Sequence, residues 1–354
     1  MVSKRVQLKS SVFDRKRIVR VLGFPLTIAL TACFSAPENA RQSEISSLAL
    51  SLKIEAESLP SQIVASPEIK ATRPWKFAIA VKDSLESEGW SQVWQAAREA
   101  ADDFGVEVVL LTNPCQTCVT EQIQEIDTLI RSQQIDGLII GVVDSIALTP
   151  VVEKAIQQGI PTIAIDTPLN SEMLVTSVGF DNFAGGKAIG EWVVKQLGDR
   201  GQVAILTGPI DHQNASDRHK GFLSGLQAGN IEIVATEAGN WETGLAREIT
   251  ARWLERYPKL DAIVAANDNM ALGASQAARA VKVPLLITGF DATDFALNAI
   301  AEGQMGATIS QEFHHQSRLS IQLLIRHLEQ KETFPPFVAV SDISLITRDN
   351  IGGD

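Results

Sequence analysis

Short apolar runs along this chain end repeatedly in polar side chains with planar hydrogen-bonding groups. In the stretch AIVAANDNMALGAS, an apolar run is followed at once by Asn267, Asp268 and Asn269. Asp, Asn and Ser cap helices, which explains any single position, but capping requires neither tryptophan nor arginine. The other runs lead to further polar and aromatic residues: Asp83, Trp90, Asp166, Asn214, Arg218, Trp241, Asp291 and Gln311.

This combination suits a ligand that carries many hydroxyl groups. Carboxylates and amides form paired hydrogen bonds with neighbouring hydroxyls, and arginine offers a fork of donors. Tryptophan rings cover the apolar C–H faces of a sugar. A nucleotide would need a glycine-rich phosphate loop, but the glycine cluster FAGGKAIGEW has neither the GxGxxG nor the GxxxxGK[ST] spacing. The sequence therefore favours a sugar or polyol over a nucleotide.

The elements that position these residues begin at Trp75, where short apolar runs start to alternate with amphipathic segments. Runs such as KFAIAV, GLIIGV and QVAILT are typical of parallel strands buried on both faces. Intervening segments such as residues 120–132 carry apolar side chains at helical spacing. The alternation predicts an α/β fold of doubly wound parallel sheets.

Two sheets fit the length better than one. A chain of 354 residues is long for a single core. The break is expected near residues 178–186, where Gly179, Gly185 and Gly186 allow a change of direction. Ligands of open α/β sheets bind beyond the carboxyl ends of the strands, where the polar residues above are expected to gather.

Between about residues 76 and 350, the chain resembles the bacterial type I periplasmic sugar-binding proteins, the ribose- and xylose-binding group above all. The stretches that carry the resemblance, in order, are AIDTP, SVGFDNFAGGKAIGEW, ASDRHKGF, ANDNMALGA, TGFDAT and ATISQ. The resemblance implies two α/β lobes, joined by a hinge of three crossings, that close over one ligand and bind it without turnover.

The chain is expected to divide into four parts. We expect a lipoprotein signal peptide (1–33), a flexible tether (34–73), an N-terminal lobe (74–180 plus 312–336) and a C-terminal lobe (181–311 plus 337–350).

By position in this resemblance, five residues would hydrogen-bond the sugar: Asp166, Arg218, Asn267, Asp291 and Gln311. Trp90 and Trp241 would stack on the sugar in place of family phenylalanines, and Asp83 and Asn214 are added from their loop positions. Asn267 would face the cleft, and either Asp268 or Asn269 would cap the next helix. Alternatively, Asp268 would support the hinge or position Asn267.

Two departures separate the chain from ribose binders. They carry paired phenylalanines in the first loop, where this chain has Gly89-Trp90, and arginine after the fourth-strand aspartate, where it has Thr167. The first loop is more similar to that of xylose binders. The identity of the sugar or polyol is therefore left open.

The amino terminus has the pattern of an export signal. A basic stretch that ends at Arg20 precedes VLGFPLTIALTA, which is too short to span a bilayer as a helix. Leu30-Thr31-Ala32-Cys33 resembles a bacterial lipobox, which implies cleavage before Cys33 and acylation of its thiol. The alternative is an ordinary signal peptide with an incidental cysteine. We expect a periplasmic or extracytoplasmic protein that meets the membrane only through its lipid anchor.

The two remaining cysteines lie in NPCQTC. In an oxidising compartment, Cys115 and Cys118 could form a disulfide that staples the loop. A redox-active pair, or half of a metal site, is the alternative. The chain has no second cysteine pair to complete a zinc tetrahedron, and we expect neither a metal nor a cofactor.

The charge argues against a nucleic-acid partner. The formal net charge is −11, and without the first 33 residues the chain has 24 basic and 41 acidic residues. A body this acidic repels phosphate backbones. A sugar-responsive repressor is not expected either, for a separate reason: the amino terminus has the pattern of an export signal in place of a helix-turn-helix.

Catalysis is the main rival to binding. Asp166 and Asp291 could in principle act as the two carboxylates of a glycosidase. None of the histidines lies in a nucleophile elbow or an HExxH pattern, and the role of the pair His314-His315 is left open. We therefore expect a binding protein and not an enzyme.

The expected partner is a membrane protein that recognises the closed, ligand-bound form. An ATP-binding-cassette permease would import the ligand, whereas a sensor kinase or chemoreceptor would report it. The sequence does not separate these roles. We expect the binding protein itself to be a monomer.

Overall fold

The computed structural model describes residues 69–132, 134–209, 212–340 and 343–351. The predicted signal peptide, Cys33 and most of the predicted tether lie outside these ranges. The end of the tether was predicted wrongly, because residues 69–73 belong to the folded body. Ile69 and Ala71 pack against its core, and the backbone N–H and hydroxyl of Thr72 both donate to Glu329.

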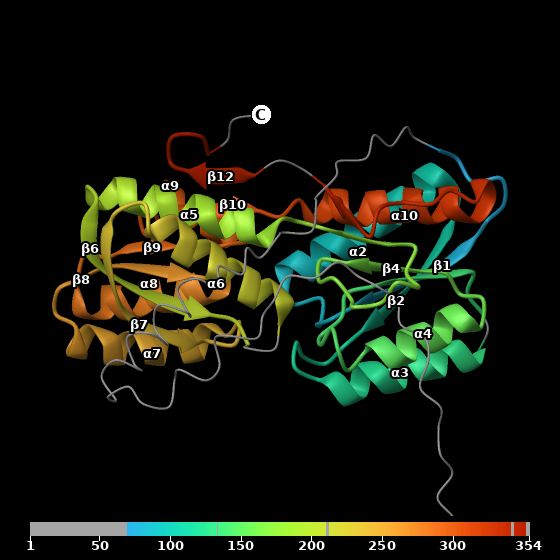
Figure 1. Ribbon diagram of the computed structural model, residues 1–354, viewed down its shortest axis with the longest axis horizontal. Helices are drawn as coiled ribbons and strands as arrows, with labels where there is room; N and C mark the ends of the chain where they lie inside the picture. The colour runs from blue at the N-terminus through green and yellow to red at the C-terminus, as the bar shows by residue number, and fades with distance from the viewer. Residues whose placement is uncertain (1–68, 133, 210–211, 341–342, 352–354) are drawn as a thin grey trace, which may run out of the picture. The chain divides into compact units, whose positions relative to one another are not determined.

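The described residues form two six-stranded sheets (Figure 1). Every neighbouring pair in the first sheet is parallel. Its order is β11 (Phe337–Ala339), β5 (Thr176–Gly179), β4 (Thr162–Ile165), β3 (Gly137–Ile140), β1 (Lys76–Val81) and β2 (Glu107–Thr112).

The second sheet repeats this plan with one antiparallel edge. Its order is β12 (Ser344–Thr347), β10 (Ala307–Ser310), β9 (Leu286–Thr288), β8 (Leu260–Ala265), β6 (Arg200–Thr207) and β7 (Asn230–Ala238). Only β12 runs against its neighbour within this sheet.

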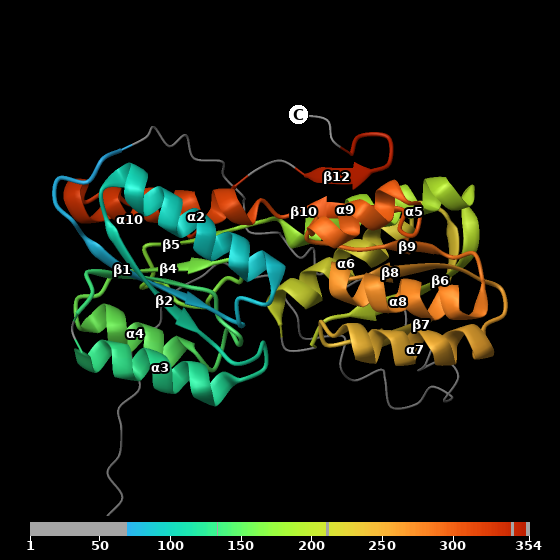
Figure 2. The same cartoon turned by 180° about the vertical axis from the view of Figure 1, so that it is seen from behind.

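Alternation along β1 shows how the first sheet is buried on both faces. Phe77, Ile79 and Val81 belong to one core cluster, whereas Ala78 and Ala80 belong to another. Helices α2 (Glu88–Phe104) and α10 (Phe313–Gln330) cover the first face, and α3 (Val119–Ser132) and α4 (Thr149–Gln157) cover the second (Figure 2). We call this sheet with its four helices the first lobe.

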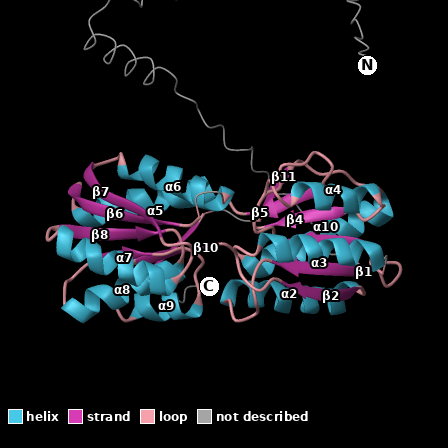
Figure 3. Cartoon of the chain, turned by 90° about the horizontal axis from the view of Figure 1, so that it is seen from below, coloured by secondary structure: helices cyan, strands magenta, loops and turns pink. Residues whose placement is uncertain are grey.

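The second sheet also lies between two layers of helices, and we call this body the second lobe. Helices α5 (Asn182–Leu197) and α6 (Gln213–Leu226) lie on one side. Helices α7 (Thr243–Arg256), α8 (Asp268–Val281) and α9 (Asp294–Ala301) lie on the other side (Figure 3).

The chain passes between the lobes three times: from β5 to α5, from β10 to α10 and from β11 to β12. The predicted fold class of two doubly wound lobes with a three-crossing hinge is confirmed. The predicted boundary at residue 337 is wrong, because β11 pairs with β5 of the first sheet before the chain crosses. Strands this short give little periodicity from which to predict their sheet.

Gly186 has another role than the predicted change of direction. Gly186 lies inside α5, where an added Cβ would be 2.4 Å from the backbone oxygen of Arg218 on α6. A Cβ on Gly225 of α6 would be 2.2 Å from the backbone oxygen of Lys187. These residues allow the backbones of α5 and α6 to touch.

No helix within the described residues is long and apolar enough to cross a membrane.

We predict that Gly225→Ala destabilises the second lobe, since the new methyl group overlaps α5. The expected loss is about 1–3 kcal/mol of unfolding free energy, measured by denaturant titration. Gly244→Ala is the matched control, because a Cβ there meets no atom within 4 Å. Helix propensity should make the control neutral or slightly stabilising. Equal stability of the two variants would contradict the close contact.

Candidate functional site

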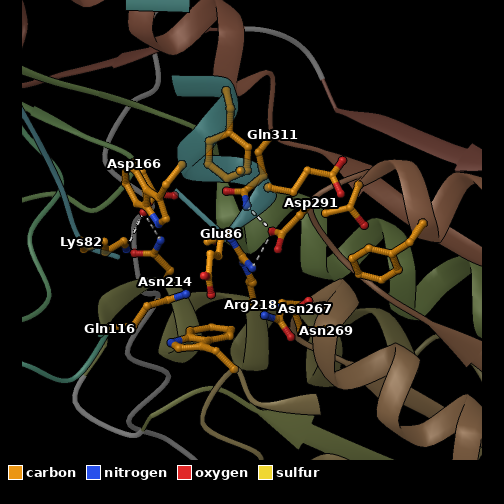
Figure 4. Close-up of a pocket in the computed structure, with 18 residues that line it drawn as sticks. Lys82, Glu86, Gln116, Asp166, Asn214, Arg218, Asn267, Asn269, Asp291 and Gln311 are labelled. Carbon is orange, nitrogen blue, oxygen red and sulfur yellow. Dashed lines mark hydrogen bonds and ion pairs between the residues drawn. The ribbon is translucent and has the colours of Figure 1, made fainter. Parts of the chain in front are cut away.

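A pocket of about 190 Å³ lies where strands of both lobes end (Figure 4). This volume is below the roughly 300–1,000 Å³ of pockets for drug-sized ligands and suits one small ring. Eight of the nine residues predicted to bind the ligand line the pocket: Trp90, Asp166, Asn214, Arg218, Trp241, Asn267, Asp291 and Gln311. Residues more than 200 positions apart in the chain therefore meet here, although their ligand-binding roles stay predictions.

Asp166 forms a buried ion pair on the first-lobe side. The Nζ atom of Lys82 lies 2.6 Å from Oδ2 of Asp166, and both side chains are almost fully buried. Thr167 and Asn214 donate to the same oxygen, over 2.9 Å and 3.1 Å. Burial opposes ionisation, but Lys82 overcomes it and holds the pKa of Asp166 below its usual value. No described residue donates to Oδ1, which is available to a ligand.

Arg218 is the corresponding centre on the second-lobe side. Its Nε donates to Asn182 over 2.7 Å, and its Nη1 donates to the backbone oxygen of Ala266 over 2.6 Å. The guanidinium carbon lies 3.9 Å from the centre of the Phe290 ring. These contacts fix the plane of the group. Among the described residues nothing accepts from Nη2, so this donor is free for a ligand.

Asp291 lies between Arg218 and Gln311. Its Oδ1 accepts from Nη1 of Arg218 over 3.4 Å and from Nε2 of Gln311. Oδ2 has no donor within the described part of the chain and is the second acceptor offered to a ligand. Figure 4 shows Asp166 and Asp291 on opposite sides of the pocket.

Two neighbouring carboxylates have raised pKa values. Removal from water raises the pKa of Asp291 to about 6, although Arg218 opposes the rise. Burial raises the pKa of Asp268 to about 8, and the charge of Asp291 adds to this. Both carboxylates are therefore harder to ionise than a carboxylate in water, because each is buried.

The three polar residues of the NDN stretch have separate roles. Asn267 is itself the N-cap of α8, because its Oδ1 accepts from the backbone N–H of Met270 over 2.9 Å. The expectation that Asp268 or Asn269 caps this helix is therefore wrong. The cap fixes the amide so that its Nδ2, which has no described partner, is left to the pocket.

Asp268 is fully buried and supports the loop that carries Asp291. It accepts from the backbone N–H and hydroxyl of Thr293, both over 2.9 Å, and from Thr308 over 2.8 Å. Asn269, by contrast, lines the pocket.

Aromatic rings also line the pocket. Trp90 packs against Phe313, with ring centres 6.3 Å apart. Trp241 donates from Nε1 to Nδ1 of His212 over 3.1 Å. Burial lowers the pKa of His212 to about 4, so this histidine stays neutral and can accept the bond. Both tryptophans are therefore held by protein contacts before any ligand arrives.

Three pocket residues hold a backbone conformation that favours glycine. The φ angles are 65° at Asp166, 68° at Trp241 and 123° at Asp291. Such geometry costs about 1–3 kcal/mol per residue and persists at binding sites where the surroundings enforce it.

Asp83 is the predicted ligand residue that does not line the pocket. Its carboxylate accepts from the backbone N–H of Ser84 over 2.8 Å and from Gln116 over 3.0 Å. The side chain that enters the pocket from this strand end is Lys82, one residue earlier. Because successive residues of an extended chain alternate in direction, a shift of one position reverses the assignment.

Sequence reasoning missed several lining residues: Lys82, Gln116, Asn269, Thr293, Phe295 and Phe313. One signal could have found Lys82, since it directly follows its apolar run as Asp166 does. Gln116 carries no such signal, because it lies within a loop, between the two cysteines of the Cys115–Cys118 disulfide.

The histidine pair lies outside the pocket. His314 forms an exposed hydrogen bond with Glu99, with 2.9 Å between Nε2 and Oε2. This contact joins α10 to α2 within the first lobe. Within the described residues, no group of three or more His, Cys, Asp or Glu side chains is placed to hold a metal.

Comparisons with known proteins agree with this geometry. Residues 77–332 match the family model described as periplasmic binding protein domain. The D-ribose/D-allose-binding protein of Pseudomonas aeruginosa is 31% identical over 73% of this chain and 85% of its own length.

Comparison with solved structures also finds proteins that bind small polyhydroxylated ligands. A periplasmic solute-binding protein of an ABC transporter from Actinobacillus succinogenes, with bound D-allose, superposes with a TM-score of 0.74 at 28% identity, over 80% of this chain and all of the other. The Caulobacter myo-inositol binding protein, bound to myo-inositol, gives a TM-score of 0.72 at 27% identity, over 80% of this chain and 97% of its own.

We predict that Lys82→Met costs about 3 kcal/mol of unfolding free energy at pH 7, because it leaves Asp166 as an unpaired buried charge. Since the pKa of Asp166 is lowered in the folded parent, its stabilising contribution is present at neutral pH and is lost as the pH falls through that folded pKa. In the variant, burial that Lys82 no longer offsets raises the pKa of Asp166, so the penalty seen at pH 7 should shrink as the pH falls and this carboxylate takes up a proton. Urea titrations between pH 3 and pH 7 measure both effects.

Lys154→Met is the matched control, since its ion pair with Asp127 is much more exposed. It should cost less than about 1 kcal/mol. Replacing both partners, in Lys82→Met/Asp166→Asn, should recover much of the loss. If the single and double variants were equally unstable, the ion pair would not be the cause.

Proposed function

Because the chain belongs to the periplasmic binding protein family, we propose that it is a sugar- or polyol-binding protein that delivers its ligand to an ATP-binding-cassette importer. The single observation that carries this proposal is the arrangement of free hydrogen-bonding atoms in a pocket the size of one ring. The protein binds its ligand and releases it unchanged, so it is not an enzyme.

The free atoms match the chemistry of a hydroxyl group, which both donates and accepts. Oδ1 of Asp166 and Oδ2 of Asp291 offer acceptors from opposite sides of the pocket. Nη2 of Arg218 and Nδ2 of Asn267 offer donors. A hydrogen bond to a charged group contributes about 1.5–3 kcal/mol and a neutral one about 1 kcal/mol, so these four contacts supply about 5–10 kcal/mol before the costs of association, and the tryptophan rings add apolar contact.

The charge balance favours a neutral ligand. Lys82 is compensated by Asp166, and Arg218 is compensated by Asp291. An anionic sugar would find no free cation among these lining residues, and it would meet the carboxylate of Glu86 as well. A neutral monosaccharide or polyol brings no charge into the pocket and so avoids the free-energy cost of burying an unpaired charge.

The relatives point to the same ligand class. The relatives compared above are named for, or hold, D-ribose, D-allose and myo-inositol, which are all neutral and rich in hydroxyl groups. Two contacts between the lobes suit a closed form that a permease recognises. Asn214 donates to Asp166, and the backbone N–H of Asp294 donates to Glu88 over 2.6 Å.

We propose further that the protein is exported and anchored by a lipid on Cys33. The basic stretch, the short apolar segment and the Leu-Thr-Ala-Cys box support this proposal. Acyl chains on Cys33 would keep the binding domain at the membrane that holds its importer.

We expect at least one neutral polyol to stabilise the purified protein against heat. At a hundredfold excess over Kd, a ligand that binds only the folded state adds about 2.7 kcal/mol, which raises the Tm by several degrees. Differential scanning fluorimetry with D-ribose, D-allose, D-xylose, xylitol and myo-inositol measures this shift. Amino acids and gluconate are the negative controls. A shift with gluconate and with no polyol would overturn the proposal.

Asp291→Ala should raise the Kd of that polyol at least about tenfold, because the ligand loses a charged acceptor and Arg218 loses its partner. Isothermal titration calorimetry gives the Kd. Asp102→Ala is the control, since Asp102 is exposed on α2, away from the pocket. Unchanged affinity in Asp291→Ala would mean that this pocket is not the binding site.

For the anchor, we expect Cys33→Ser to move the protein from membrane fractions to soluble fractions or to block its processing. Immunoblots of fractionated cells that express each form measure this. Parent and variant fractionating alike would exclude acylation of Cys33 as the anchor.

A further inference from the structure

The loop between β2 and α3 contains a disulfide next to the pocket. Cys115 and Cys118 are joined, and the short ring that they close contains Gln116 and Thr117. Gln116 lines the pocket, whereas Thr117 is exposed and does not. In Figure 4 the side chain of Gln116 extends toward the centre of the pocket. The disulfide therefore brackets a residue of the binding site.

The buried side chain of Asn113 holds the same loop by hydrogen bonds. This side chain is 1% exposed, and its Nδ2 donates to the backbone oxygens of both Cys115 and Cys118, over 2.5 Å and 3.1 Å. The two ends of the ring are thus fixed to one buried amide. This arrangement leaves Gln116 little freedom to move relative to β2.

Asp83 fixes the far end of the Gln116 side chain. Nε2 of Gln116 donates one hydrogen to Oδ2 of Asp83 over 3.0 Å, while the other oxygen of Asp83 is held by the N–H of Ser84. The second hydrogen on Nε2 and the oxygen Oε1 have no partner in the described part of the chain. An amide held in this way offers one donor and one acceptor to a hydroxyl group.

We propose that Gln116 binds a hydroxyl group of the ligand, and that the Cys115–Cys118 disulfide and Asp83 are positioning elements for Gln116. The affinity of the pocket then depends on the oxidation state of this disulfide. The inference rests on the proposed function, since it assigns part of the same site.

The physical reason is the conformational freedom of the loop. A short segment without its cross-link samples many backbone conformations, and binding must select the one in which Gln116 faces the ligand. The disulfide removes this cost in advance. Both cysteines are only partly buried, so a reductant can reach the bond. With dithiothreitol, the S–S bond accepts two electrons and two protons to give two thiols, and the reductant is oxidised to its cyclic disulfide.

The test is a mutant cycle in which isothermal titration calorimetry measures the Kd of each variant. Every protein carries Cys33→Ser, so that Cys115 and Cys118 are the only cysteines left to respond to a reductant. The probes are D-ribose, D-allose, xylitol and myo-inositol, and the tightest binder is used throughout. We expect Gln116→Ala to raise the Kd about fivefold, which corresponds to one ordinary hydrogen bond. Cys115→Ser/Cys118→Ser should raise it by a similar factor. The triple variant should be no weaker than either, because both changes remove the same contact.

Two controls separate this mechanism from a general loss of structure. Thr117→Ala changes the same loop outside the pocket and should bind like the parent. Dithiothreitol should weaken binding by the parent but leave the serine double variant and Gln116→Ala unaffected. Hydrogen exchange without ligand should show faster exchange at residues 113–118 after reduction, with the core strands unchanged.

The outcomes are distinguishable. If a polyol binds the parent but Gln116→Ala binds equally well, Gln116 makes no ligand contact and the inference is wrong while the function stands. If the losses in Kd multiply in the triple variant, the disulfide acts by another route and the inference is also wrong. If no polyol binds the parent, the proposed function fails, and the inference fails with it.

Discussion

Charged groups in this pocket must stay ionised and oriented although little water reaches them. A lone buried carboxylate would take up a proton, and its hydrogen-bonding character would change. The structure meets this constraint twice, with Lys82 beside Asp166 and Arg218 beside Asp291. Each partner engages one oxygen of its carboxylate and leaves the other free. The positive φ angles and the buried Asp268 all serve to hold these two pairs in place.

The sequence predicts the architecture because the pattern behind it is repeated. Ten apolar runs alternate with helical segments, and each repetition supports the same α/β topology. The short strands β11 and β12 offer no repetition, and the error at residue 337 follows from that. Gly186 shows another limit. Its sequence neighbours suggest a change of direction, but its role depends on a helix that contacts it from residues 213–226.

The site could be predicted where a side chain directly follows an apolar run, as Asp166 and Asn267 do. Prediction failed where the roles of adjacent residues depend on direction, because Asp83 and Lys82 differ by one position and point to different surroundings. It also failed where one side chain does two jobs. Asn267 caps α8 with its side-chain oxygen and leaves its side-chain nitrogen to the pocket. From the sequence, capping and binding are assigned to different residues, so it is not predicted that Asn267 does both. Gln116 lies inside a cross-linked loop, and the sequence left that cross-link as one of several alternatives.

The contact between α5 and α6 has a consequence for protein engineering. The backbone of Arg218 packs directly against Gly186, and a Cβ at position 186 would overlap the backbone oxygen of Arg218. The position of the Arg218 guanidinium in the pocket therefore depends on position 186 having no side chain. Gly186 would never appear among the residues chosen to alter ligand preference, since it does not face the ligand. Most variants with another residue at position 186 would have Arg218 displaced, and their ligand binding would be weakened whatever the ligand. Efforts to retune this receptor as a sensor for other polyols should therefore keep the glycine contact constant and vary the side chains in front of it.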